Sequence, residues 1–210
     1  MVKLKVEQVL ETPKPKGKMQ IGIAPIEIAS MQLKCVGETS LLQEKMADRI
    51  REQLKNIVTG KGKEKNKNRD LDREVEEKIH RNAKGEVCFP TSGFQKAMVE
   101  AAPYLDGLDK KKAKGSFFIL GELTPIKYKK QVTNKAVGRD SGINRAPREI
   151  WRPEFQEWST VLTIRYNSQQ ITPQQIVELA KLAGFHIGVG SWTPQHGGQY
   201  GMFTVTGAGA

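Results

Sequence analysis

Near its carboxyl-terminal end the chain alternates strictly between inward and outward positions. The alternation begins at Trp158 and continues for about nine residues, with polar side chains filling most of the second set. A period of two residues predicts a β-strand with one buried face. The side chains predicted to face the core are Trp158, Thr160, Leu162, Ile164 and Tyr166.

The next segment has the spacing and the end signals of a helix. Thr172 is placed as the N-cap, with Gln175 three residues later as its capping-box partner. Pro173 occupies the first helical position, and Gly184 is placed as the C-terminal stop. We therefore expect a helix from about Pro173 to Gly184.

A glycine-rich stretch closes the chain. We expect it to form a short strand, a Gly-Gly turn and a final strand from Met202 to Val205. Strand, helix and hairpin in this order make half of a ferredoxin-like fold. The fold class that we predict is α+β: a ferredoxin-like (RRM-type) αβ sandwich with an antiparallel sheet and long basic loop insertions.

The first half of the chain supplies the other predicted elements. A first core strand begins near Ile21 and ends at Gly37, and a change of phase in its apolar residues predicts a bulge near Ala29 and Ser30. The remaining elements are helices over Ser40–Val58 and Leu71–Asn82, a strand over Glu86–Pro90, a helix capped by Thr91 or Ser92, and a central strand within 116–126.

Several segments have no apolar periodicity. Residues 59–70 and 127–152 are rich in Lys and Arg, and we expect both to be basic loops inserted into a single domain over residues 21–205. Residues 1–20 are predicted to be a flexible arm, and residues 206–210 a flexible tail.

Charge decides the expected partner. The chain has 210 residues and a formal net charge of +11, with a sequence pI near 9.6. Such a surplus of cations favours a polyanion, with nucleic acid first and an anionic membrane surface second. No apolar run approaches the ~20 residues that cross a bilayer, so we expect no membrane association.

The two cysteines and the amino terminus indicate the compartment. Cys35 and Cys88 are far apart in sequence and lie within predicted strands, so buried free thiols are expected, with a disulfide as the lesser alternative. The first residues are basic and lack the apolar core of a signal peptide. We expect a cytoplasmic protein in a bacterial host cell.

The segment 127–152 is the main candidate for binding. Guanidinium groups pair with phosphates, and aromatic faces such as those of Tyr128 and Trp151 accept unstacked bases. A loop that crosses the sheet would place these groups over an RRM-like surface. The structural alternative is that Arg148 and Arg152 form internal salt bridges, while Trp151 and Phe155 pack the loop onto the core.

Few residues suit catalysis. The chain has three histidines, and its cysteines and histidines do not have metal-ligand spacing. Gly60 and Lys61 lack the flanking residues of a phosphate-binding P-loop. His196 as a general base is the remaining enzymatic alternative. We expect a protein that is not an enzyme and has no cofactor and no metal.

Four separated pieces carry a family resemblance. They are GETSLL after the first strand, VCFPTSGFQKAMVEAA, NRAPREIWRPEFQEW and AGFHIGVGSWTPQHGGQYGMFTV. Together they resemble a group of bacteriophage-encoded proteins, and more distantly they are similar to the RAMP superfamily. The resemblance extends to the backbone subunits of CRISPR effector complexes. Those subunits have a modified RRM core and coat single-stranded RNA. The resemblance implies nucleic-acid binding and oligomerisation, and it leaves the choice between DNA and RNA open.

The resemblance carries over residue by residue at two motifs. Arg145, Arg148, Arg152, Pro153, Phe155 and Trp158 match the loop motif, and Gly188, Gly190, Trp192 and Pro194 match the end motif. Thr193 stands where the common form of the end motif has Arg, so a phosphate contact from that position is absent here.

The function that we predict is sequence-tolerant binding of single-stranded nucleic acid by self-associating copies, with DNA in phage replication or recombination as the first choice. One alternative is a CRISPR-type backbone subunit on guide RNA. The other is a protein-interaction module, such as a phage inhibitor that mimics a host defence subunit. The predicted contact residues are Lys61, Lys63, Lys65, Lys67, Arg69, Lys127, Lys129, Lys130, Lys135, Arg139, Arg145, Arg148, Trp151 and Arg152.

Overall fold

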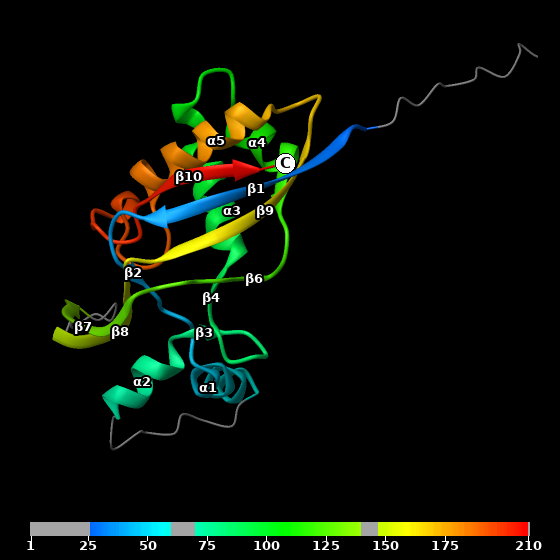
Figure 1. The fold of residues 1–210 in the computed structure, drawn as a ribbon. Helices are drawn as coiled ribbons and strands as arrows, with labels where there is room; N and C mark the ends of the chain where they lie inside the picture. The colour runs from blue at the N-terminus through cyan, green and yellow to red at the C-terminus, as the bar shows by residue number, and fades with distance from the viewer. Residues whose placement is uncertain (1–25, 60–69, 140–146, 210) are drawn as a thin grey trace, which may run out of the picture.

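A four-stranded antiparallel sheet organises the upper part of the protein (Figure 1). The computed structural model describes residues 26–59, 70–139 and 147–209. The strands lie in the order β10-β1-β9-β5. Their bounds are Ile28–Gly37 for β1, Phe117–Ile119 for β5, Ser159–Asn167 for β9 and Phe203–Gly209 for β10. The fold is therefore α+β with antiparallel pairing, as predicted.

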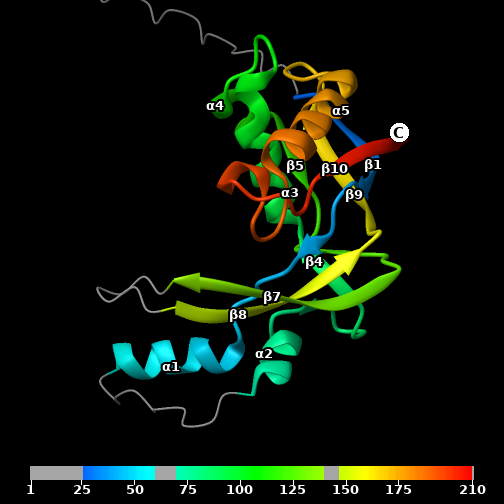
Figure 2. The ribbon, with the colours of Figure 1, turned by 90° about the vertical axis from the view of Figure 1, so that its left-hand side faces the viewer.

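Three helices cover one face of this sheet and leave the other face open (Figure 2). They are α3 (Thr91–Ala101), α4 (Lys110–Ser116) and α5 (Pro173–Leu182), with the short 3-10 turn η1 (Ala102–Tyr104) after α3. The strand β9 turns Thr160, Leu162, Ile164 and Tyr166 inward. The alternation predicted from sequence is thus confirmed, because it matches a sheet that is buried on one side only.

The predicted start of α5 is confirmed, whereas its predicted end is wrong. Thr172 and Gln175 form the complete capping box, with Pro173 in the first turn. The chain does not stop at Gly184 but continues through a π-helical turn, η2 (Ala183–Ile187), and leaves the helical conformation at Gly188, where φ is 73°. Gly184 has a different role, because a Cβ there would overlap the carbonyl oxygen of Phe203 in β10.

The glycine-rich segment after η2 contains no strand before β10, so the predicted strand there is wrong. The segment bends through the short 3-10 turn η3 (Pro194–His196) and reaches β10 at Phe203. A backbone hydrogen bond from Val189 to Gly201 closes the segment on itself, and one from Gly201 to Ser40 holds it against the turn that follows β1. Isolated bonds of this kind replace the ladder that a strand would have formed.

The first strand ends at Gly37 as predicted but begins at Ile28, whereas the predicted start near Ile21 lies outside the described residues, and the predicted bulge near Ala29 and Ser30 is absent. Residues Ile28 to Val36 pair with β9 in unbroken register. The register shift lies instead between Lys34 and Cys35, on the β10 side. Ile26 and Ile28 alternate out of phase with the buried residues Met31, Leu33 and Cys35, and both remain exposed on the open side of the sheet.

A second region lies beyond one end of the sheet (Figures 1 and 2). It contains two three-stranded sheets, ordered β2-β8-β7 and β3-β4-β6, and two helices. The strands are β2 (Leu41–Leu42), β3 (His80–Arg81), β4 (Val87–Pro90), β6 (Leu123–Pro125), β7 (Lys130–Arg139) and β8 (Pro147–Gln156). The helices are α1 (Asp48–Val58) and α2 (Leu71–Glu77).

Three predicted elements change their bounds in this region. The helix predicted from Ser40 begins only at Asp48, because Leu41 and Leu42 are fully buried in β2. The helix predicted to reach Asn82 ends at Glu77. The central strand predicted within 116–126 is divided between β5 and β6, which pair in different sheets on either side of a turn at Gly121 (φ 86°).

The largest correction concerns residues 127–152, which are not a structureless loop. Most of them form the β7–β8 hairpin, a ladder of ten pairs from Lys130–Gln156 to Arg139–Pro147. The hairpin stays beyond the end of the four-stranded sheet, beside α2 (Figures 1 and 2), so the expectation that it crosses the sheet face is wrong. Both faces of the ladder carry polar side chains, which is why the pattern gave no strand signal.

Both cysteines are free and buried, Cys35 in β1 and Cys88 in β4, as predicted. Burial raises the pKa of the Cys35 thiol to about 12 and also raises the pKa of Cys88. No helix in the described ranges combines the length and the apolar composition needed to cross a bilayer.

The close approach at Gly184 gives a stability prediction. Gly184→Ala forces a methyl group into the backbone of β10, so we expect destabilisation of about 1–3 kcal/mol or more, measured by chemical denaturation. Gly115→Ala in α4 is the matched control, because a Cβ there meets no atom and alanine favours a helix. Equal stability of the two variants would contradict the assigned role of Gly184.

Candidate nucleic-acid interface

The open face of the four-stranded sheet lacks the stacking platform of an RRM. Its central strands present Ser30, Gln32 and Lys34 from β1, and Val161, Thr163 and Arg165 from β9. The exposed aromatic ring of Phe118 lies on the edge strand β5. RRM sheets bind bases by stacking them on aromatic side chains of the sheet. We therefore place the candidate interface on the hairpin and its base.

One face of the hairpin carries Lys135 and Trp151, which are paired across the ladder. The Lys135 ammonium lies 4.1 Å from the centre of the Trp151 ring, and the ring is half-buried. Lys78 at the end of α2 donates to the Trp151 carbonyl oxygen over 2.6 Å. The bond from Lys78 holds the hairpin beside α2. Within the hairpin, Lys135 occupies one face of the Trp151 ring in a cation–π pair.

The opposite face of the hairpin is linked to the glycine-rich segment through the Glu44 carboxylate. Arg152 Nε donates to Glu44 over 2.9 Å, and the Arg152 side chain is only 14% exposed. The same Glu44 oxygen accepts from Ser191 over 2.7 Å. Arg152 thus makes the internal salt bridge that sequence reasoning had weighed against phosphate binding.

The pKa of Glu44 reflects this environment. Burial acts to raise it, but hydrogen bonds from Ser191 and Arg152 and the charges of Arg152 and Lys78 outweigh burial. The net effect is a lowered pKa, because the surrounding donors stabilise the carboxylate form. The contact therefore holds the hairpin base in place most strongly when Glu44 is ionised.

The other predicted contact residues, besides Trp151 and Arg152, fall into three groups. Lys127, Lys129, Lys130 and Lys135 are exposed along β7 and the chain leading into it, although Lys129 pairs with Glu157 over 3.0 Å. Arg139 and Arg148 join the ladder near its tip through their backbones, and their side chains lie outside the described part. Also outside the described residues are Lys61, Lys63, Lys65, Lys67, Arg69 and Arg145.

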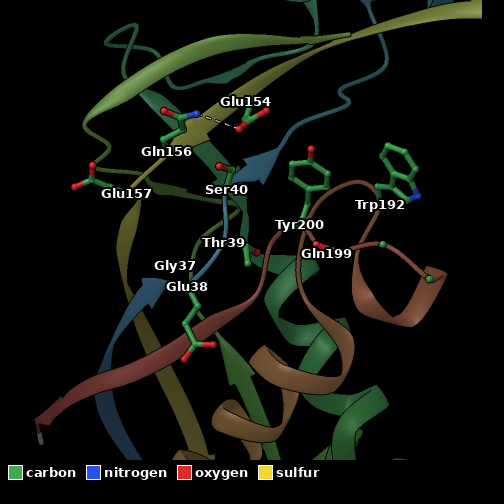
Figure 3. A pocket seen from close by; sticks show the side chains of 12 residues that line it. Gly37, Glu38, Thr39, Ser40, Glu154, Gln156, Glu157, Trp192, Gln199 and Tyr200 are labelled. Carbon is green, nitrogen blue, oxygen red and sulfur yellow. Dashed lines mark hydrogen bonds between the residues drawn. The ribbon is translucent and has the colours of Figure 1, made fainter. Parts of the chain in front are cut away.

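A cavity of about 780 Å³ opens at the base of the hairpin (Figure 3). Three segments far apart in sequence form it: the turn between β1 and β2, the end of β8, and the glycine-rich segment. Its lining residues are Gly37, Glu38, Thr39, Ser40, Glu154, Gln156, Glu157, Trp192, Gly197, Gly198, Gln199 and Tyr200. Sequence reasoning missed this site.

The cavity combines an aromatic wall with carboxylates. The rings of Trp192 and Tyr200 are nearly parallel, with centroids 6.1 Å apart, and Trp192 is 50% exposed. Asn134 in β7 donates to both the Tyr200 hydroxyl (3.1 Å) and Glu154 (3.0 Å), so the hairpin positions both walls. The end motif contained Trp192, which was the one available signal. The carboxylates were passed over because they are scattered in sequence.

Among the described residues, no group of three or more His, Cys, Asp or Glu side chains is arranged to hold a metal ion. His196 Nδ1 lies 3.1 Å from the Thr193 hydroxyl. Burial, followed by the charges of Lys45 and Arg51, lowers the pKa of His80.

Comparisons with known proteins show a likeness to solved structures. No family model and no curated protein matches the chain. A chain in the cryo-EM structure of a type III-B CRISPR complex, Cmr-beta bound to cognate target RNA, is similar with a TM-score of 0.54 and 11% identity. The match covers 86% of this chain and 60% of that chain, so this protein spans less than two thirds of its length.

A second solved structure, Cmr6 from Pyrococcus furiosus, has a TM-score of 0.45 and 9% identity, over 87% of this chain and all of that one. The first match establishes a likeness of fold to a subunit of a type III-B CRISPR complex. The distant similarity to the RAMP superfamily is therefore confirmed for the fold. The resemblance to bacteriophage proteins stays a prediction.

The lowered pKa of Glu44 gives a pH-dependent prediction. A carboxyl group whose pKa is lower in the folded state stabilises the fold above its unfolded-state pKa, and this contribution is lost as the pH falls through the folded-state value. We expect Glu44→Gln to be less stable than the parent at neutral pH, with a difference that shrinks on acidification. Urea unfolding at a series of pH values measures it.

The matched control for this experiment is Glu178→Gln on the exposed side of α5. It should follow the parent protein at every pH, because surface substitutions usually change stability by less than about 0.5 kcal/mol. A difference between Glu44→Gln and the parent that does not vary with pH would contradict the electrostatic role of Glu44.

Proposed function

We propose that this protein is an RNA-binding subunit of a multi-subunit nucleic-acid complex, and that it holds a single strand along the β7–β8 hairpin. The observation that carries the proposal is the hairpin itself, a projecting ladder of ten pairs whose edge strand β7 exposes Lys130 on one face and Lys135 on the other. Binding is the whole of the proposed function and involves no catalytic step.

The strand order supports an RRM-type core. The elements β1, α3, β5, β9, α5 and β10 follow one another as strand, helix, strand, strand, helix, strand. This is the ferredoxin-like succession, and here β1 and β9 occupy the two central places of the sheet. In the proposed arrangement the core is a scaffold, and the hairpin and cavity at its end make the contacts.

RNA is preferred to the single-stranded DNA that the sequence favoured. The solved structure with the similar chain is that of a complex bound to its target RNA. A role in phage DNA replication or recombination has no comparable support. The proposal therefore adopts the alternative of a CRISPR-type subunit on RNA, and association of neighbouring copies along the strand remains part of it.

Charge supports sequence-tolerant binding. The formal net charge of +11 attracts a polyanion, and lysines that neutralise phosphates release condensed counterions. The bond from Lys78 to the Trp151 carbonyl and the ion pair of Arg152 with Glu44 fix the hairpin, so less conformational freedom is lost on binding. Extraction and sequencing of co-purified nucleic acid tests the choice of RNA. Recovery of DNA alone would contradict it.

The hairpin lysines give a binding prediction. Lys130→Ala with Lys135→Ala should weaken binding to single-stranded RNA about tenfold or more and lower the salt dependence by about 1.4 in the logarithmic slope, because two phosphate contacts are lost. Fluorescence anisotropy over a salt series measures both quantities. The double change Lys111→Ala with Lys114→Ala in α4, at the opposite end of the molecule, is the matched control.

If the α4 variant weakens binding as much as the hairpin variant, the charge acts without a defined site and the hairpin assignment is wrong. Binding that does not respond to salt would exclude phosphate contacts altogether.

A further inference from the structure

Backbone strain is concentrated in the cavity at the hairpin base. Among the described residues, the two non-glycine residues with positive φ are Glu157 (51°) and Trp192 (57°). Both line this cavity, although they are in different segments of the chain. Such conformations are unfavourable for residues with a Cβ, persist only where the surroundings enforce them, and cluster at ligand sites.

The surroundings of Trp192 enforce its position. Ser191 donates its backbone N–H to Leu42 over 3.0 Å, and Tyr200 donates to the Trp192 carbonyl over 3.2 Å. Gly198 lies so close to that carbonyl that a Cβ would overlap it. The indole is thus held half-exposed on a fixed loop, an arrangement that suits stacking against a flat ligand.

The surroundings of Glu157 enforce the second strained position. It forms the corner between β8 and β9, directly before the fully buried Trp158. Its carboxylate receives the Lys129 ammonium at 3.0 and 3.2 Å. The ion pair with Glu157 therefore holds the Lys129 ammonium at the rim of the cavity, near the hydrogen-bond acceptors of its lining.

The acceptors of the cavity fit a ligand that presents N–H donors. Glu154 accepts one hydrogen bond at each oxygen, from Asn134 and from Gln156, and a carboxylate oxygen has room for a second. Glu38 adds an exposed carboxylate (Figure 3). A negatively charged ligand group is disfavoured among these side chains, whereas a flat ring with amino and imino hydrogens is favoured.

The rim of the cavity carries positive charge, in contrast to the carboxylates of its lining. Lys130 is paired with Gln156 across the ladder, so its side chain lies on the same face of the hairpin as Glu154 and Gln156. Lys129 lies at the rim through its contact with Glu157. Two lysines beside an acidic aromatic cavity suit a nucleotide, whose phosphate is negative while its base edge donates, better than a cationic peptide.

We propose that this cavity binds one unstacked nucleobase of the bound strand, with guanine preferred. The base stacks on Trp192, and its phosphate lies towards Lys129 and Lys130. Guanine offers two adjacent N–H donors, from its ring nitrogen and its amino group, to a single carboxylate such as Glu154, whereas uracil offers one donor. The volume of about 780 Å³ lies within the usual range of ligand sites. This inference rests on the proposed RNA-binding function.

The test compares two short RNA oligomers on the full-length protein: an oligouridine, and the same oligomer with one central guanosine. We expect the guanosine to tighten binding about tenfold, the usual discrimination from one bidentate base contact. Trp192→Gly should remove most of this preference and should also weaken binding of the oligouridine, because the stacking surface is available to any base, while the slope of the salt dependence stays unchanged. Glycine accepts the positive φ of Trp192, so the variant keeps the loop conformation.

Phe118→Ala is the matched control, because it removes an exposed aromatic ring from the open sheet face. It should keep the preference for guanosine. Equal, salt-sensitive binding of both oligomers overturns the base site but leaves the RNA-binding function intact. If neither oligomer binds, the RNA-binding function fails and the base site with it. Binding of an arginine-rich peptide that Trp192→Gly abolishes, without any guanosine preference, also overturns the proposal, in favour of a protein partner.

Discussion

The burial of Trp158 is the contact on which the arrangement of this protein depends. Its side chain is fully buried against the rings of Phe94 and Phe203, which come from α3 and β10. Its indole N–H donates to the Thr39 carbonyl over 2.8 Å, and Gly37 lies so close that a Cβ there would overlap the indole. One side chain therefore ties the hairpin strand β8, the sheet and the turn after β1 together at the place where the cavity forms.

Electrostatic contacts add a second level of order at the same place. Glu44 links β8 to the glycine-rich segment, through its ion pair with Arg152 and its hydrogen bond from Ser191, and Asn134 joins β7 to Tyr200. These polar contacts specify how the hairpin meets the core, whereas apolar burial supplies most of the driving force. The surface that remains for a ligand is thus divided into an outer ladder with lysines and an inner cavity with carboxylates and aromatic rings.

The sequence predicted those parts of the fold that follow a simple period. The alternation in β9 and the capping box of α5 are local signals, and both are confirmed. The hairpin was missed because its inward residues, such as Asn134 and Arg152, are polar and bond to partners distant in sequence. Gly184 was misread because a stop signal and a close packing contact both favour glycine. The cavity could not be predicted, since Glu38, Glu154 and Trp192 line one site only after the end of β1, the end of β8 and the glycine-rich segment have come together.

The corner at Glu157 has a mechanical consequence. Strand β8 leaves the hairpin and passes through this single corner into β9, one of the two central strands of the main sheet. The cavity lies beside this corner, and its walls come from both sides of it: Glu154 and Gln156 belong to β8, whereas Glu38 follows β1. A displacement of the hairpin relative to the main sheet would therefore change the shape of the cavity.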